Sequence, residues 1–215
     1  MSTTLLFAEL LIIGVQAGIW LLLLVLNLTG LDWLQRIQFV AVADWQALIV
    51  VILLSLLYVL GIIVDRVADS IFSRWEFRIT IETLRELKEL KLPLVVLRFA
   101  TSKDDEHLNH QYEYNRSRMR ITRASSVNFA LITVFALSLI FVHGQSLPDA
   151  LKWRLSIVVF ILGTLLTFAA VYSWRKLMRG YVGMVRDNYL HRSQKEIPMA
   201  AQKTEGGSQK PSGAG

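Results

Sequence analysis

Four long stretches of the chain contain no Lys, Arg, Asp or Glu: residues 10–31, 45–64, 124–148 and 155–174. Each stretch has at least 20 residues, and a helix of roughly 20 residues is long enough to cross a ~30 Å hydrocarbon layer. Inside lipid no water is present to satisfy backbone polar groups, whereas a helix satisfies them internally. The four stretches therefore predict an all-α integral membrane protein with four transmembrane helices.

The positive charges are distributed unevenly between these stretches. Of the 23 Lys and Arg, 12 lie within residues 66–123 and eight within residues 175–210, which leaves Arg36, Lys152 and Arg154 for the other two connections. Lys and Arg are enriched on the cytoplasmic side of membrane proteins, so both termini are expected in the cytoplasm. The expected location is the bacterial inner (plasma) membrane, with membrane lipids as partners.

The apolar pattern divides the chain into four regions. Residues 1–64 form a first transmembrane hairpin, residues 65–123 a cytoplasmic helical segment, and residues 124–192 a second transmembrane hairpin with a cytoplasmic helical extension. The Lys-, Gly- and Ser-rich residues 193–215 have the composition of a disordered tail. The fold prediction is a four-helix membrane protein whose second and third transmembrane helices extend into a cytoplasmic helical stalk.

Several local features refine this prediction. Residues 75–82 alternate like a β-strand, but a lone strand would have no partner, so we favour a helix there. Pro93 ends or kinks that helix. Ser102, which acidic residues follow, is the expected start of a helix of about 40 residues that continues through the third apolar stretch. The apolar residues 39–43 are expected along the outer membrane surface.

Gly14 and Gly18 form a small-xxx-small pattern inside the first apolar stretch. Such a pattern lets two helix backbones approach closely. Two locations for this contact stay open: within one protomer, which we favour, or between subunits of a homo-oligomer. Because the apolar stretches contain few polar residues, an active transporter is not expected, and a narrow pore lined by Gln, Ser and Thr is the alternative.

Arg116, Arg120 and Arg123 follow one another at intervals that place them on one helix face, whereas Arg118 points elsewhere. Guanidinium groups bind phosphate through paired hydrogen bonds. This face is therefore a candidate anion- or lipid-binding site for a nucleotide, an RNA backbone or a phospholipid headgroup. The alternative, which we favour, is that these arginines only hold the helix at the membrane surface.

Glu106, His110 and Glu113 lie at the start of the same helix with a spacing that also puts them on one face. Carboxylate and imidazole groups bind divalent metals, but two or three ligands on a single helix do not complete a site. We favour a solvated polar face here. No metal and no other cofactor is predicted, and the absence of Cys excludes thiolate sites.

The six residues from Arg186 to His191 resemble the short motif of HEPN-type ribonucleases, which are helical proteins. In that family, paired Arg and His residues form a metal-independent RNA-cleaving site across a dimer. The resemblance implies that Arg186 stabilises phosphate charge and that His191 serves in acid–base chemistry. The surrounding sequence has no HEPN-like soluble four-helix domain.

These observations give one leading hypothesis and two alternatives. The leading hypothesis is a non-enzymatic, homo-oligomeric membrane effector, scaffold or adaptor whose cytoplasmic segment binds a cytosolic ligand or protein. The first alternative is a pore or ion channel that the stalk gates. The second is a membrane-tethered HEPN-like ribonuclease that uses Arg186 and His191.

Overall fold

The computed structural model describes residues 3–30, 45–85, 93–103, 105–144 and 148–206. In these residues the chain forms five helices: α1 (Thr3–Thr29), α2 (Gln46–Thr83), α3 (Leu94–Ser102), α4 (Glu106–His143) and α5 (Asp149–Gly206). All except α3 are long and apolar enough to cross a membrane. The predicted all-α fold with four helices of membrane-spanning length is confirmed.

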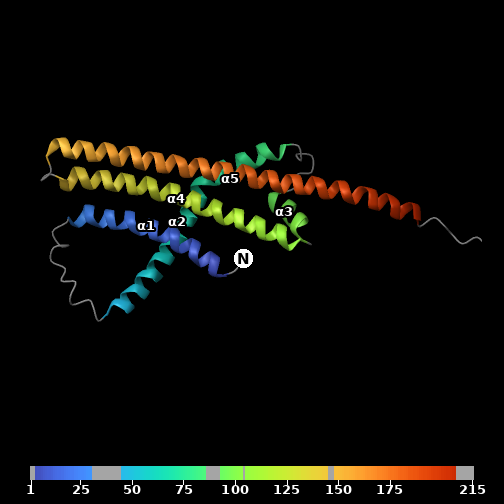
Figure 1. Cartoon of the computed structure of the whole chain (residues 1–215), viewed down its shortest axis with the longest axis horizontal. Helices are drawn as coiled ribbons and strands as arrows, with labels where there is room; N and C mark the ends of the chain where they lie inside the picture. Colours follow the sequence, from blue (N-terminus) through green and yellow to red (C-terminus); the bar gives the residue numbers. More distant parts are fainter. Residues whose placement is uncertain (1–2, 31–44, 86–92, 104, 145–147, 207–215) are drawn as a thin grey trace, which may run out of the picture.

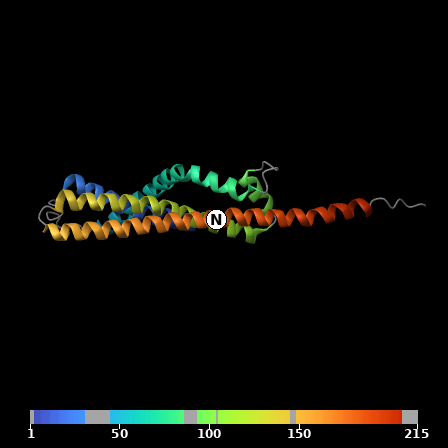
Figure 2. The ribbon, with the colours of Figure 1, turned by 90° about the horizontal axis from the view of Figure 1, so that it is seen from above.

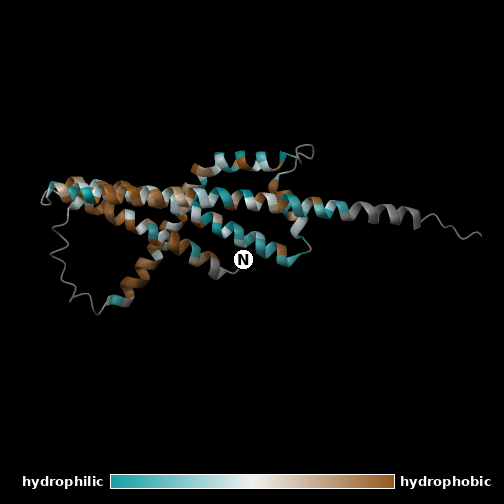
Figure 3. Cartoon of the chain, turned by 45° about the horizontal axis from the view of Figure 1, so that its top comes forward, coloured by the Kyte–Doolittle hydropathy of each residue, from teal (hydrophilic) through white to brown (hydrophobic). Residues whose placement is uncertain are grey.

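The helices form an elongated bundle (Figure 1). α4 and α5 run antiparallel side by side, α1 lies against α4, and α2 crosses α1 obliquely so that its first turns diverge from the bundle. α5 extends beyond the other helices at one end (Figure 2). Apolar residues gather along α1, the start of α2 and the half of α4 and α5 nearest their connection, while polar residues cover the first turns of α4 (Figure 3).

We call the polar half of the molecule the arm. It comprises α3 and the parts of α2, α4 and α5 that lie beyond the apolar stretches. The arm has a hydrophobic core, to which four helices contribute and which also includes Trp174, the last residue of the fourth apolar stretch: Phe72, Ile79, Leu97, Tyr112, Met119, Trp174, Met178, Tyr181, Val182 and Val185. In this core, α3 and the extension of α5 pack together with the extensions of α2 and α4.

α2 continues as one helix to Thr83, which confirms a helix rather than a strand at residues 75–82. The reason is visible in its buried residues: Val64, Ala68, Phe72 and Ile79 recur at helical spacing and pack on one side. A single buried face thus runs from the apolar stretch into the arm. Residues 86–92, which precede Pro93, lie outside the described residues.

The start of α4 differs from the sequence prediction. Asp105, not Ser102, caps the helix, since its carboxylate accepts a hydrogen bond from the Leu108 N–H at 3.0 Å. Ser102 is instead the last residue of α3, a separate helix that begins after Pro93. α4 then continues without interruption for 38 residues, about 57 Å at 1.5 Å per residue, as the long-helix prediction required.

α5 is longer than expected. It is helical to Gly206, whereas the sequence predicted a disordered tail from residue 193 onward. Residues 199–203 (Met-Ala-Ala-Gln-Lys) are all strong helix formers. Pro198 directly precedes them and disfavours a helix interior, so local propensity does not explain this extension. Residues 207–215 and the apolar segment 39–43 lie outside the described residues.

Candidate functional site at the end of the apolar stretches

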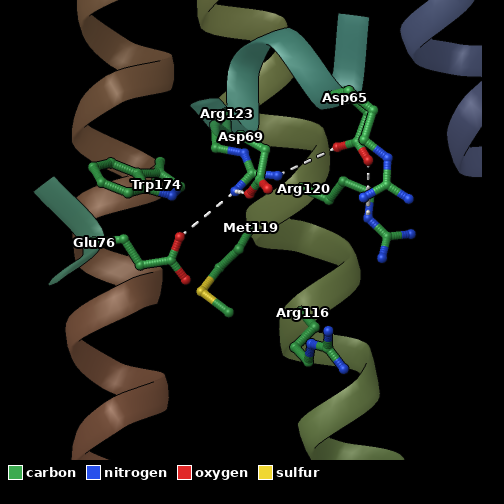
Figure 4. Close-up of a pocket in the computed structure, with 9 residues that line it drawn as sticks. Asp65, Asp69, Glu76, Arg116, Met119, Arg120, Arg123 and Trp174 are labelled. Carbon is green, nitrogen blue, oxygen red and sulfur yellow. Dashed lines mark hydrogen bonds and ion pairs between the residues drawn. The ribbon is translucent and has the colours of Figure 1, made fainter. Parts of the chain in front are cut away.

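Charged side chains from three helices meet where α2 and α4 leave their apolar stretches. We call this set the boundary network; it consists of Glu9, Asp65, Asp69, Glu76, Arg120 and Arg123. The carboxylates of α2 follow the second apolar stretch at helical intervals, so they share one face. That face is turned toward the arginine face of α4 that the sequence indicated (Figure 4).

Arg123 is the centre of the network. Its guanidinium Nη1 lies 2.6 Å from Asp69 Oδ1 and 3.6 Å from Glu76 Oε2, and its Nη2 lies 3.4 Å from Asp65 Oδ1. Figure 4 shows this guanidinium between the carboxylates of α2. The Arg123 side chain is 12% exposed and Asp65 is 14% exposed, so the pair between them is shielded from water. Asp69 and Glu76 are 53% and 40% exposed, so water screens their pairs with Arg123 more strongly.

Arg120 extends the network to α1. Its Nη1 lies 3.3 Å from Glu9 Oε2, and its Nε lies 3.7 Å from Asp65 Oδ2. Glu9 is 2% exposed, and a charged carboxylate at such a position requires a cationic partner. Asp65 contacts both arginines and therefore connects the two halves of the network.

Arg116 does not join the boundary network. It lies nearer the N-terminus of α4 than Arg120 and Arg123 (Figure 4), and its Nη1 is 3.5 Å from Glu113 Oε1. Glu113 also pairs with Arg98 of α3. The structure thus separates the three predicted arginines: Arg120 and Arg123 are paired with carboxylates of α1 and α2, and Arg116 is paired within the arm.

A cavity of about 190 Å³ borders the network. Its lining residues are Asp65, Arg66, Asp69, Glu76, Arg116, Met119, Arg120, Arg123 and Trp174. These include four guanidinium groups and three carboxylates, and the Glu9 carboxylate beside Arg120 makes the numbers equal. The cavity offers groups of both signs and no excess of positive charge, unlike a dedicated anion site.

The Glu76 carboxyl has a raised pKa. Burial raises its pKa above the ordinary value of 4.5, Arg123 partly opposes that rise, and the neighbouring Asp69 adds to it. The protonated form of Glu76 is therefore favoured relative to a carboxylate in water. This shift could not be predicted from the sequence, because its cause is the packing of α2 against α4.

A second polar cluster joins α1 to α4 inside the apolar stretches. Asn128 is fully buried; its Oδ1 accepts a hydrogen bond from Trp20 Nε1 at 3.0 Å, and its Nδ2 donates to the Ile13 carbonyl at 3.2 Å. The Ser125 hydroxyl donates to Gln16 Oε1 at 2.9 Å, and Asn128 Nδ2 lies 3.3 Å from the same oxygen. These polar groups are satisfied by one another within the protomer.

The structure places Gly14 and Gly18 at the crossing of α1 and α2. A Cβ atom on Gly14 would overlap the Leu57 carbonyl oxygen, and one on Gly18 would lie 2.7 Å from a methyl carbon of the Leu57 side chain. Gly61 of α2 is equally crowded by the α1 backbone at Leu10. Both glycines of the pattern therefore lie against α2 of the same protomer.

The HEPN-like segment lies in the arm and contributes to its packing. Asn188 Nδ2 donates a hydrogen bond to the Tyr112 hydroxyl at 3.0 Å, and that hydroxyl also lies 3.2 Å from Thr101 Oγ1. Arg186 Nε donates to Asp187 Oδ1 at 2.9 Å, while His191 is exposed. Part of the segment thus fixes α5 against α3 and α4.

The three candidate metal ligands at the start of α4 are used differently. His110 Nε2 lies 3.8 Å from Glu106 Oε1, whereas Glu113 pairs with Arg98 and Arg116. In the described part of the chain, no group of three or more metal-binding side chains comes together.

Protein-family models, curated proteins and solved structures were compared with the chain, and none of them matches it.

Proposed function

We propose that the chain is a non-enzymatic, multi-pass membrane adaptor whose arm lies in the cytoplasm and binds a cytosolic protein. The observation that supports this most directly is the arrangement of α3. Leu97 and Thr101 are 1% and 3% exposed on the side that packs into the arm, whereas Val95 and Phe99 are 75% and 66% exposed on the other side. One face of α3 is thus packed into the arm, and the other presents exposed apolar side chains. α3 lies outside all four apolar stretches, so these side chains are not part of a predicted transmembrane helix.

The surroundings of this apolar face indicate the chemistry of the partner. A cavity of about 420 Å³ beside it is lined by Val95, Arg98, Phe99, Ser102, Lys103 and Asn109. Arg98 already pairs with Glu113, which leaves Lys103 as the cation at the rim. Exposed apolar side chains with a polar, basic rim are typical of protein-binding sites. The expected partner is a protein segment with apolar side chains flanked by acidic residues.

The rest of the molecule fits an anchoring role. The boundary network joins α1, α2 and α4 at the base of the arm, so the arm is held in a fixed orientation to the apolar helices. In this proposal, the many Lys and Arg of the arm keep it and both termini in the cytoplasm, at the bacterial inner membrane.

A homo-oligomer is part of the proposal. Trp45 and the residues of α2 from Gln46 to Leu56 are exposed around the whole helix, because this segment diverges from the other described helices. Lipid or a second copy of the chain can cover such a surface. Since Gly14 and Gly18 are used inside the protomer, the diverging segment of α2 is the better candidate for contact between subunits.

The structural contacts favour the adaptor over both alternatives. A pore lined by Gln, Ser and Thr would need Gln16, whose side-chain oxygen already accepts hydrogen bonds from Ser125 and Asn128 of α4. A ribonuclease would use the segment from Arg186 to His191, in which Asn188 already serves the packing of the arm.

The test is a comparison of two matched variants of the full-length protein, purified from membranes in mild detergent. Phe99→Ser removes the apolar side chain from α3, and Phe77→Ser, at a 67% exposed site on α2, is the control. A protein that copurifies with the wild type should bind Phe99→Ser about tenfold more weakly, since such a loss requires about 1.4 kcal/mol. Equal losses in both variants, or no copurifying protein, would contradict the proposal.

A further inference from the structure

A cavity of about 390 Å³ lies between α2 and α5 at the point where α5 leaves its apolar stretch. It is lined by Trp75, Arg78, Ile79, Glu82, Val171, Arg175 and Arg179. We propose that this cavity binds the phosphate-containing headgroup of an anionic phospholipid. The site is separate from the face of α3, and it rests on the membrane location in the proposed function.

The charge of this cavity differs from that of the boundary network. Three guanidinium groups face a single carboxylate, Glu82. Within the described ranges, Arg78, Arg175 and Arg179 have no ion-pair partner, whereas Arg120 and Arg123 have several. Arg175 and Arg179 are also four residues apart on one helix, so their like charges repel. A bound phosphate would relieve this repulsion and accept paired guanidinium hydrogen bonds.

The position of the cavity favours a lipid over a soluble phosphate. Val171 belongs to the fourth apolar stretch, and Arg175 comes directly after that stretch. One end of the cavity therefore borders the fourth apolar stretch at Val171, and Arg175 and Arg179 follow directly beyond that stretch. Trp75, which is 47% exposed and packs near Trp174 with ring centroids 6.5 Å apart, is an aromatic residue of the kind found at this level of a membrane.

The two walls of the cavity are held in place by the core of the arm. Ile79 is 4% exposed, and Phe72 packs edge-on against Trp174 with ring centroids 4.6 Å apart. These contacts fix α2 against α5 through the core of the arm. The backbones that carry the three arginines are therefore positioned before any ligand binds. Such preorganisation reduces the entropy lost on binding and favours a defined site over diffuse attraction.

The test uses the full chain in mild detergent, with phosphatidylglycerol as the anionic probe and phosphatidylcholine as the neutral one. Native mass spectrometry counts the lipids that each protein retains. The wild type should retain phosphatidylglycerol in preference to phosphatidylcholine. The variant with Arg78→Gln, Arg175→Gln and Arg179→Gln should lose this preference by about tenfold or more, because charge-assisted hydrogen bonds are removed.

Lys176→Gln is the matched control, since Lys176 is exposed on the same helix at the same depth but does not line the cavity. It should keep the preference for phosphatidylglycerol. Equal losses in this control and the triple variant would overturn the defined site in favour of diffuse attraction. Displacement of the lipid by millimolar inorganic phosphate would overturn the lipid assignment.

Each variant is also reconstituted into vesicles of phosphatidylcholine alone. Insertion of the triple variant, together with loss of the phosphatidylglycerol preference, supports the headgroup site. Failure of the wild type to insert would overturn the proposed membrane location itself, so the two failures are distinguishable. If only the triple variant fails to insert, the single substitution Arg179→Gln replaces it, and an unchanged lipid preference in that variant would overturn the site.

Discussion

Gly14 of α1 and Gly61 of α2 face each other where the two helices cross. A Cβ atom on Gly14 would lie 3.2 Å from the Gly61 backbone nitrogen, and one on Gly61 would lie 3.1 Å from the Gly14 nitrogen. Each Cβ would also overlap a carbonyl oxygen of the other helix. The steep crossing that sends α2 across the bundle and into the arm therefore depends on the absence of side chains at these two positions.

Replacing Gly14 or Gly61 with Ala should destabilise the fold by about 1–3 kcal/mol, because the backbones must move apart to accommodate the methyl group. Thermal unfolding of the purified protein in detergent measures this loss. Gly180→Ala and Gly183→Ala are the controls, since a Cβ there meets no atom within 4 Å. Both should be neutral or stabilising by up to about 1 kcal/mol, because Ala favours helix. Equal destabilisation at all four sites would contradict the crossing.

Arg123→Gln should be more damaging than other charge substitutions on α4. It removes the common cation of Asp65, Asp69 and Glu76. Because Asp69 and Glu76 are partly exposed and Asp65 keeps Arg120 as a partner, the expected cost is about 1–2 kcal/mol. Arg118→Gln is the control: Arg118 is exposed and stacks over the Tyr114 ring at 5.5 Å, so its loss should cost about 0.5–1 kcal/mol. Similar melting temperatures for the two variants would show that the boundary network adds little stability.

Glu76 should make stability depend on pH. Because burial raises the Glu76 pKa above 4.5, the folded protein holds this proton more tightly than the unfolded chain does. Stability from this group therefore falls as the pH rises from about 4.5 through the raised pKa. Glu76→Gln should remove that fall and give a melting temperature at about pH 8 equal to or above that of the wild type.

The control for Glu76 is Asp69→Asn, which removes the 2.6 Å ion pair with Arg123. This variant should be less stable than the wild type at about pH 8, because it loses a short, charge-assisted contact. Melting temperatures between about pH 5 and pH 8 test both variants. A Glu76→Gln profile as steep as that of the wild type would assign the pH dependence to other groups.

The sequence predicted the helices better than their contacts. A helix through lipid must be apolar over a fixed length, so helices of that length could be predicted from runs without charge. A helix over residues 75–82 could be predicted because a lone strand there would have no partner. The partners of Arg120 and Arg123 could not be found in this way. Glu9 is 111 residues from Arg120 in the sequence, and only the packing of three helices brings them together.

The short and polar elements were also difficult to predict. α3 has nine residues, too few for its periodicity to be distinguished from that of an apolar loop. Arg175 and Arg179 were part of the general positive charge after the fourth apolar stretch, and only the position of α2 beside them reveals a cavity. The local pattern of apolar residues determines which segments are helical. The arginine cavity between α2 and α5 depends instead on which helices pack beside each other.

Asn128 should hold α1 against α4. Asn128→Leu leaves the Trp20 indole N–H without its acceptor inside an apolar region, and a loss of about 0.6–2 kcal/mol is expected. A double-mutant cycle with Trp20→Phe tests whether the two residues act together. Trp20→Phe should cost less in the Asn128→Leu background than in the wild type, because the unpaired donor is then absent. Additive effects would show that the hydrogen bond contributes nothing.

The proposed orientation can be tested because the chain contains no Cys, so single cysteines report their own accessibility. His107→Cys lies at an exposed position in the arm and Gln202→Cys near the end of α5, while Gln38→Cys lies in the connection after α1. None of the three changes a Lys or Arg, so the charge distribution that sets orientation is preserved. A membrane-impermeant maleimide should label Gln38→Cys in intact cells and the other two only after permeabilisation. Labelling of His107→Cys in intact cells would place the arm outside and reverse the orientation on which the adaptor proposal rests.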